Sequence, residues 1–304
     1  MKNKLTLVGL EIEGDWNVSL LANAAEMSGA SLSFAGNVDS TGESKIGSDP
    51  LPQIDELLGQ FDHVLACEAT ERGKAVYDFA APRGHLGVIV GNERKGVPST
   101  VLKRADHIVS IPMFGRGLSS VNVAVAAAIV LYVVERDLGR KHPRTSSLCH
   151  NDVDILVIGP PDPSELGSLL RSAWAFGWQR LYLADRAAIW FTKDRPTVLA
   201  GRAAARCEVN RIAVRPDSQL NVQDYDRIVV CEDLPRGTPL SRYTLPRCEK
   251  MLLVYGGTDR QIEDGKAVER IYIDHAAPVE ARFRHKGSIL LSVVSRLLRR
   301  GRRG

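Results

Sequence analysis

The chain has 304 residues, of which 44% are hydrophobic and 25% charged, and its formal net charge is +4. This length is sufficient for two domains with separate cores, and the composition excludes a disordered or low-complexity protein. The longest apolar stretch, residues 121–134, is interrupted by Asn122 and falls short of the roughly 20 residues that span a bilayer.

The N-terminal sequence contains no apolar core of signal-peptide length, because Glu11 and Glu13 soon follow Met1. Five cysteines show no close paired spacing, which is typical of reduced thiols in the cytoplasm. We therefore expect a cytoplasmic protein without a membrane partner.

Short apolar runs alternate with helical patterns along the first half of the chain. Strands are expected at residues 5–10, 31–34, 63–67, 87–90 and 107–111, and helices over 17–27, from 54 to 58 and over 121–136. Residues 36–50, rich in Gly, Ser and Asp, are expected to form a loop. Strands that alternate with helices predict an α/β fold, in which helices cover both faces of a parallel sheet.

The second half repeats this order. Strands are expected at 154–158, 180–184, 227–231, 251–255 and 270–273, and helices over 164–176 and 288–298. Residues 61–68 (FDHVLACE) align with residues 225–232 (YDRIVVCE) at an offset of 164 positions. The sequence thus predicts domains at 1–140 and 151–304 with a linker at 141–150. Repetition of a unit this large is typical of a fused homodimer, which keeps its two-fold interface.

Charge is distributed unevenly between the halves. Residues 1–140 hold 13 Lys or Arg and 17 Asp or Glu, a net of −4, whereas residues 151–304 hold 25 and 19, a net of +6. A polyanion would therefore meet the second half first. The Arg-rich end, from Arg296 to Arg303, fits a polyanion-binding segment and a solvated helix end equally well.

Three segments of the first half resemble motifs of the SpoU/TrmH group of SPOUT RNA methyltransferases. Residues 17–23 (NVSLLAN) are similar to the opening motif but have Asn23 in place of its arginine. Residues 88–97 (VIVGNERKGV) match the Gly-x-Glu-x-x-Gly loop, and residues 111–126 (IPMFGRGLSSVNVAVA) are close to the third motif. Their order and spacing are specific, although each motif alone is weak.

In the second half only the opening motif is well kept. Residues 165–177 (ELGSLLRSAWAFG) resemble it and include the arginine, Arg171, with Glu165 in place of its asparagine. Residues 256–259 (GGTD) and 286–289 (KGSI) stand where the second and third motifs are expected. The two halves have therefore kept different motifs, which suggests one composite active site in a pseudo-dimer.

The resemblance implies a SPOUT fold in each half, with a trefoil knot in the C-terminal part of each, and S-adenosylmethionine as the cofactor. It also implies RNA methylation, most simply of a ribose 2′-oxygen in tRNA or rRNA. The cofactor-binding residues would be Gly91, Asn92, Ile111, Met113 and Val121. Gly91 would allow a close backbone approach. No metal is expected.

The catalytic residues implied by the resemblance are Arg171, Glu93, Ser120 and Asn122. A guanidinium has a pKa above 12, so Arg171 is expected to stabilise a developing alkoxide rather than act as a base. Ser120 and Asn122 could also cap the last helix of the first half. Asn17 and Asn23 would then belong to a vestigial half-site.

Candidate RNA-binding residues lie in the long connection of the second half, residues 186–210. Arg195, Arg202 and Arg206 can pair with phosphate and stack on bases. Trp178 and Trp190 could add stacking surfaces, although core positions are more typical of tryptophan. The chain is expected to act as an internal pseudo-dimer, for which a monomeric chain would suffice.

Two alternatives stay open at this point. Loss of the arginine at Asn23 and the decayed motifs of the second half fit a non-catalytic RNA-binding or ribosome-assembly factor. Glu165 in place of the motif asparagine fits an S-adenosylmethionine-dependent methyltransferase with a non-RNA acceptor.

Overall fold

The computed structural model describes residues 4–36, 54–115, 120–138, 152–206, 212–246, 248–257, 262, 268–277 and 279–300. The expected linker at 141–150 and most of the loop at 36–50 lie outside these ranges.

The chain divides into two compact units, each of which contains a segment from the other half of the sequence. Unit 1 comprises Met1–Pro112, Asn122–Lys141 and His275–His285. Unit 2 comprises Met113–Val121, His142–Asp274 and Lys286–Gly304. Segment 113–121 of the first half thus belongs to unit 2, and segment 275–285 of the second half belongs to unit 1.

Unit 1 is built on a parallel sheet, which confirms the expected fold class. Within the described residues its six strands run in the order β2-β1-β5-β3-β6-β4. Neighbouring strands pair in parallel, as β1 does with β5. Their bounds are β1 Lys4–Leu10, β2 Ser31–Ala35, β3 His63–Cys67, β4 Lys74–Ala75, β5 His85–Val90 and β6 His107–Ser110.

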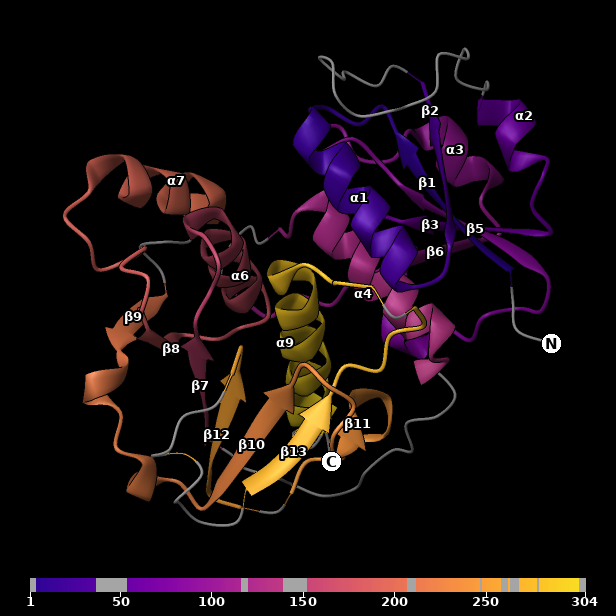
Figure 1. The fold of residues 1–304 in the computed structure, drawn as a ribbon. Helices are drawn as coiled ribbons and strands as arrows, with labels where there is room; N and C mark the ends of the chain where they lie inside the picture. Colours follow the sequence, from indigo (N-terminus) through magenta and orange to yellow (C-terminus); the bar gives the residue numbers. More distant parts are fainter. Residues whose placement is uncertain are drawn as a thin grey trace. The chain divides into compact units, whose positions relative to one another are not determined.

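Helices cover both faces of this sheet (Figure 1). Helices α1 (Asp15–Met27) and α4 (Val123–Glu135) pack against each other on one face. On the other face, α2 (Ile54–Leu58) and α3 (Ser99–Arg104) share an apolar cluster with β1, β3 and β5. A short 3₁₀ helix, η1, covers Val76–Asp78. Helix α4 is apolar on almost every side, because it is nearly all buried.

Unit 2 has a seven-stranded parallel sheet in the described residues, in the order β11-β13-β10-β12-β7-β8-β9. Read from β8 to β11, six of these strands repeat the order of the unit 1 sheet from β2 to β4, and β9 adds an edge strand beside β8. The bounds are β7 Asp152–Ile158, β8 Arg180–Ala184, β9 Ala213–Pro216, β10 Arg227–Glu232, β11 Thr238–Pro239, β12 Lys250–Tyr255 and β13 Val268–Tyr272.

Helices α6 (Pro163–Ala175) and α9 (Phe283–Arg300) occupy one face of the second sheet (Figure 1). Within unit 2 they are joined by a buried hydrogen bond from Ser288 Oγ to Ser172 Oγ at 2.8 Å. Short 3₁₀ helices cover Asp217–Gln219 (η3), Val222–Asp224 (η4) and Leu240–Arg242 (η5). On the opposite face, Leu156, Ile228 and Leu252 belong to the apolar cluster of the sheet.

Helix α7 (Arg195–Ala205) was not expected, because its segment was interpreted as a long connection. The helix begins at Asp194, whose Oδ2 accepts a hydrogen bond from Thr197 N, and Pro196 lies in its first turn. It packs tightly on α6: a Cβ on Gly167 would lie 2.2 Å from the carbonyl oxygen of Gly201. The two glycines therefore permit this close packing of the helix backbones.

No helix in the described ranges is long and apolar enough to cross a membrane.

Candidate active site

A tight glycine loop follows strand β5 in unit 1. Gly96 has φ of 69°, a conformation that favours glycine, and its N–H donates to Asn92 O at 2.9 Å. A Cβ on Gly91 would lie only 2.2 Å from the carbonyl carbon of Gly96. Gly91 is thus required for the loop to close, and its predicted contact with the cofactor stays a prediction.

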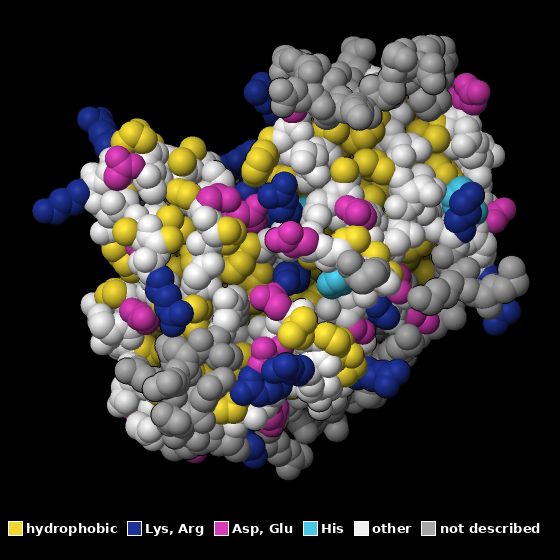
Figure 2. Space-filling model, in the orientation of Figure 1, with side chains coloured by type: hydrophobic (Ala, Val, Ile, Leu, Met, Phe, Trp, Pro, Cys, Tyr) yellow, Lys and Arg dark blue, Asp and Glu magenta, His cyan; other side chains and the backbone are white. Residues whose placement is uncertain are grey.

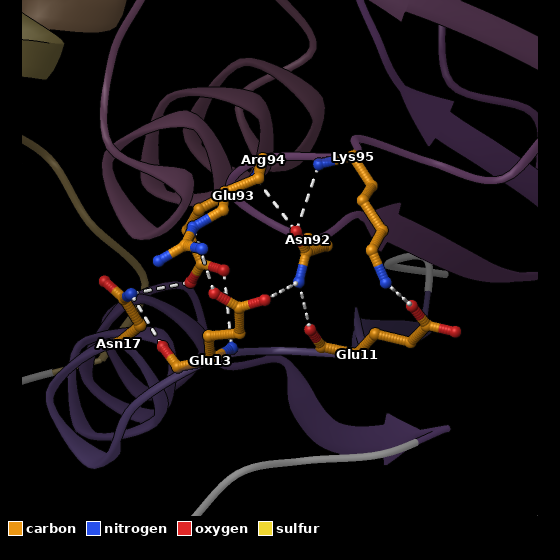
Figure 3. Close-up of polar contacts among 7 residues, drawn as sticks. All are labelled: Glu11, Glu13, Asn17, Asn92, Glu93, Arg94 and Lys95. Atoms are coloured by element: carbon orange, nitrogen blue, oxygen red, sulfur yellow. Dashed lines mark hydrogen bonds and ion pairs between the residues drawn. The ribbon is translucent and has the colours of Figure 1, made fainter.

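Asn92 holds this loop against the end of β1. It is 5% exposed, its Oδ1 accepts hydrogen bonds from Arg94 N and Lys95 N, and its Nδ2 donates to Glu11 O at 2.7 Å (Figure 3). A further bond runs to Glu13 Oε1 at 3.2 Å. The side chain of Asn92 is therefore engaged within the protein, and only its backbone is suited to contact a cofactor.

Glu68 is a loop residue that the sequence reasoning missed. It follows β3, and its Oε2 accepts a hydrogen bond from Val97 N at 2.6 Å while Oε1 accepts one from Ala69 N at 3.1 Å. A Cβ on Gly96 would lie 2.4 Å from Glu68 Oε2. The carboxylate thus holds the far end of the glycine loop. The Cys-Glu pair repeated at 67–68 and 231–232 was the available signal.

A chain of hydrogen bonds joins two of the predicted catalytic residues, Glu93 and Asn122, within unit 1. Asn17 Nδ2 donates to Glu93 Oε1 at 2.6 Å (Figure 3), and Asn122 Nδ2 donates to Asn17 Oδ1 at 2.9 Å. Asn122 Oδ1 in turn caps α4 by accepting from Ala124 N at 2.9 Å. Asn17 is therefore the link of this network, which corrects its assignment to a vestigial half-site with Asn23.

The other two predicted catalytic residues, Arg171 and Ser120, meet within unit 2. Arg171 lies on α6 and is 5% exposed. Its Nε donates to Ser120 O at 2.8 Å, and its Nη2 donates to Ser120 Oγ at 2.6 Å and to Val121 O at 3.1 Å. An arginine from the second half is thus fixed to segment 113–121 of the first half, and Val121 directly precedes Asn122 in the sequence.

Asn23 makes a related set of contacts within unit 1. Its Nδ2 donates to Glu280 O at 2.9 Å, and its Oδ1 accepts from Arg282 N at 3.0 Å and lies 3.2 Å from His285 Nδ1. Ser120 and Glu280 each stand three residues before the first residue of a helix, Val123 of α4 and Phe283 of α9. Asn23 therefore donates to the carbonyl of Glu280 as Arg171 donates to the carbonyl of Ser120, but with an amide in place of a guanidinium.

The remaining cofactor-binding candidates are divided between the units. Ile111 follows β6 in unit 1 and is 8% exposed, whereas Met113 and Val121 are partly buried residues of unit 2. Each is described only within its own unit, so the adenine slot that they were expected to form stays a prediction.

Two described cysteine thiols have pKa values shifted by burial. Burial raises the pKa of Cys67 and of Cys231 to about 12, so both thiols are protonated at neutral pH. Within the ranges that the structure covers, no three His, Cys, Asp or Glu side chains are grouped as metal ligands would be.

The RNA-binding candidates lie on α7 and directly after it. Arg195 and Arg202 are exposed, and Leu199, which is 56% exposed, lies on the same face because these residues are spaced by four and three positions. Arg206, which is also exposed, follows the last residue of the helix and has φ of 56°. Figure 2 shows Lys and Arg side chains projecting over α7 beside hydrophobic ones. We call Arg195, Leu199, Arg202 and Arg206 the α7 stripe.

The two tryptophans near this region are buried or partly buried. Trp178 is 6% exposed and donates from Nε1 to Ser295 Oγ at 2.8 Å. Trp190 is partly buried, and its ring packs closely on α7: a Cβ on Gly201 would lie 3.1 Å from it. Core positions, the second interpretation of these residues, therefore describe Trp178 best.

Comparison with known proteins identifies relatives that match segments of the chain. A 73-residue segment is 38% identical to an uncharacterized tRNA/rRNA methyltransferase of Synechocystis and covers 24% of this chain and 18% of that protein. A 79-residue segment is 37% identical to the 23S rRNA (guanosine(2553)-2'-O)-methyltransferase RlmP of Bacillus subtilis, covering 26% and 31%. The tRNA (guanosine(18)-2'-O)-methyltransferase of Aquifex aeolicus is 41% identical over 54 residues, covering 18% and 25%.

The chain thus spans a third or less of the length of these curated relatives. Among solved structures, the SpoU methyltransferase AviRb of Streptomyces viridochromogenes aligns with a TM-score of 0.39 and 22% identity, over 46% of this chain and 60% of that one. The model of the SpoU rRNA Methylase family matches residues 4–132, which include the glycine loop, Asn17 and Asn122. Residues 4–132 are therefore similar to the SpoU rRNA Methylase family.

Proposed function

We propose that the chain is an S-adenosylmethionine-dependent RNA methyltransferase that methylates a ribose 2′-oxygen of tRNA or rRNA. The observation that carries this proposal is the contact of Arg171 with Ser120 and Val121, next to Asn122 of the Glu93–Asn17–Asn122 network. The SpoU match and two relatives named as 2'-O-methyltransferases support the reaction class.

In this proposal the chain is a fused pseudo-dimer with one composite active site, and each half contains a trefoil knot. The shared order of six strands in the two sheets supports the duplication. So do the equivalent contacts of Arg171 with Ser120 O and of Asn23 with Glu280 O. The boundaries 1–140 and 151–304 would mark the two original copies, with segments 113–121 and 275–285 exchanged.

The cofactor would be held by the glycine loop after β5 together with Ile111, Met113 and Val121. Because the side chains of Asn92 and Glu68 are engaged in closing the loop, the backbone of residues 91–97 is the available polar surface. Backbone groups and apolar side chains fit an adenine, which needs an apolar slot with a few donors and acceptors. When bound, the cofactor supplies an electrophilic methyl group on a sulfonium that leaves as a neutral thioether.

The residues of the chain would then raise the reactivity of the acceptor oxygen. The Arg171 guanidinium stays protonated, so it stabilises the negative charge that grows on the 2′-oxygen as its proton departs. Ser120 orients this guanidinium by accepting two of its hydrogen bonds. Glu93 and Asn122 keep a fixed geometry through Asn17, so the catalytic groups are preorganised.

The α7 stripe would hold the RNA. Its three arginines can neutralise phosphates, and Leu199 gives an apolar surface for a base or ribose. The second half of the sequence, with its net charge of +6, is the natural platform for a polyanion.

One observation favours a second candidate function, a non-catalytic RNA-binding or ribosome-assembly factor. Arg171 donates three hydrogen bonds to protein acceptors, Ser120 O, Ser120 Oγ and Val121 O, as a purely structural arginine would. Methyl transfer separates this candidate from the enzyme.

Transfer of a labelled methyl group to RNA tests the proposed function. Total RNA from cells that lack the protein is incubated with the chain and labelled S-adenosylmethionine, and is then hydrolysed with alkali. A 2′-O-methyl group blocks alkaline cleavage of the adjacent phosphodiester, so label in alkali-resistant dinucleotides is the expected result. Label in mononucleotides would indicate a methylated base, and RNA binding without any label would identify the non-catalytic factor.

A further inference from the structure

Trp16 is an exposed aromatic side chain in the segment that matches the SpoU family, and the account so far gives it no role. It is 49% exposed and is the second residue of α1. The next residue is Asn17, which joins Glu93 to Asn122. A large aromatic ring is usually well covered in a folded protein, so a half-exposed indole at this point is informative.

Two arginines of segment 275–285 lie over the indole ring, and all three residues belong to unit 1. The Cζ atom of Arg284 is 5.2 Å from the ring centroid, and that of Arg282 is 5.9 Å away. Both distances are typical of cation–π contacts. Arg284 is 3% exposed and thus forms the inner support of the ring, whereas Arg282 is exposed.

The position of Arg282 is fixed through its backbone. Its N–H donates to Asn23 Oδ1 at 3.0 Å, and Asn23 Nδ2 donates to Glu280 O two residues earlier. Asn23, which stands at the lost arginine position, therefore holds Arg282 beside Trp16. The site is prearranged rather than assembled from free surface side chains.

The charge beside Trp16 differs in sign from that of residues 1–140. Residues 1–140, which form most of unit 1, carry a net charge of −4, and segment 275–285 adds two arginines against one glutamate. An indole face beside an exposed guanidinium suits a nucleotide, because the base can stack on the ring while the guanidinium pairs with the phosphate. An apolar peptide would gain nothing from the guanidinium.

We propose that Trp16 and Arg282 form a stacking site for one unpaired nucleotide of the RNA substrate. The proposal rests on the proposed function for the identity of the ligand, and it assigns to unit 1 an RNA contact made by other residues than the α7 stripe. A base stacked on Trp16 lies one residue along α1 from Asn17. The site therefore holds the substrate strand near the Glu93–Asn17–Asn122 network.

Binding of a short single-stranded RNA of mixed sequence, followed by fluorescence anisotropy, tests this site without any need for methyl transfer. Trp16→Ala is expected to weaken binding roughly tenfold, because base–aromatic stacking contributes about 1–3 kcal/mol. Trp16→Phe, which keeps an aromatic face, should retain most of the affinity. Arg282→Ala should weaken binding and lower the slope of log K against log salt by about 0.7, the effect of one phosphate contact on a single strand.

Leu234→Ala is the matched control, because Leu234 is also an exposed large apolar side chain, 58% exposed, in unit 2. It should leave RNA affinity unchanged, and all variants should keep the wild-type melting temperature and cofactor affinity. Equal losses for Trp16→Ala and Trp16→Phe, or no loss for either, would overturn the proposal and leave the cluster as a support of segment 275–285. If Trp16→Ala loses affinity, Trp16→Phe keeps it and the wild type transfers no methyl group, the stacking site stands and the proposed function fails.

Discussion

Glu68 is the residue on which the shape of the glycine loop depends most directly. Its carboxylate accepts hydrogen bonds from Val97 N and Ala69 N, and hydrogen bonds to a charged group contribute about 1.5–3 kcal/mol each. We predict that Glu68→Ala weakens binding of S-adenosylmethionine at least about tenfold, as measured by calorimetry.

Glu232 provides the matched control for this prediction. It ends β10 as Glu68 follows β3, and it pairs with Arg270 instead of a loop backbone. Glu232→Ala should therefore leave cofactor affinity at the wild-type value. Equal affinities in the two variants would show that the glycine loop does not depend on Glu68.

His285 gives the chain a specific response to acid. Burial, with Arg284 and Arg282 nearby, lowers the pKa of His285 to about 3, whereas the unfolded chain has a value near 6.5. Between these values the unfolded state binds a proton that the folded state does not, so stability falls as pH falls from about 6.5. The contribution is up to about 1.4 kcal/mol per pH unit.

His285→Gln should therefore show a shallower loss of unfolding free energy between pH 6.5 and 4.5 than the wild type. Denaturant unfolding at several pH values measures the two slopes. Parallel slopes would mean that His285 is solvated and not buried against Asn23.

At this scale the sequence predicted part of the candidate site. It selected Glu93, Asn122, Ser120 and Arg171, and the structure joins them in two pairs. It misassigned Asn17, because the bond to Glu93 spans 76 positions and only the folded sheet brings the two together. It did not foresee the close approach of Gly91 to Gly96, because the shape of the loop is not encoded in a local pattern.

At the scale of elements, buried strands were the most predictable features. The strands His63–Cys67 and Arg180–Ala184 have the predicted bounds, because continuous apolar runs between polar residues specify them. Helix α7 was missed because its buried face consists of Gly201 and Ala205. Packing through such small residues leaves no apolar period in the sequence. The two-residue strands β4 and β11 are too short to give any pattern.

The α7 stripe leads to a prediction about salt dependence. Replacing Arg195, Arg202 and Arg206 by Ala should weaken RNA binding and lower the slope of log K against log salt by about 2, if each arginine meets one phosphate of a single strand. A variant with Arg215, Arg236 and Arg242 replaced by Ala is the control, because these residues are also exposed arginines of unit 2. Equal effects of the two triple substitutions would show that binding follows net charge and not the stripe.

At the scale of the whole molecule, the account assigns one cofactor site to each chain. The glycine loop, Asn17 and Asn122 belong to the segment 4–132 that matches the SpoU family, whereas the second half has Glu165 at the position of Asn17. Titration calorimetry with S-adenosylmethionine should therefore give a stoichiometry of about one. Two equal sites would show that the second half has kept a working pocket.

The proposed internal duplication could be put forward from sequence because residues 61–68 and 225–232 share a pattern. The exchange of segments 113–121 and 275–285 could not, because linear boundaries carry no information on which unit a segment joins. That exchange places Ser120 with Arg171 and Arg282 with Trp16. Both proposed RNA contacts of these arginines therefore depend on it.

The most direct test of the account is methyl transfer by Arg171→Ala and Arg171→Lys under single-turnover conditions, with cofactor affinity measured on the same samples. Lysine keeps the charge but cannot reproduce the fork of hydrogen bonds to Ser120 and Val121. Arg180→Ala, which removes the buried ion pair with Asp154, controls for loss of stability in unit 2. We predict that both Arg171 variants bind S-adenosylmethionine as the wild type does but transfer methyl at least about 100-fold more slowly. Transfer at the wild-type rate by either Arg171 variant would contradict the account.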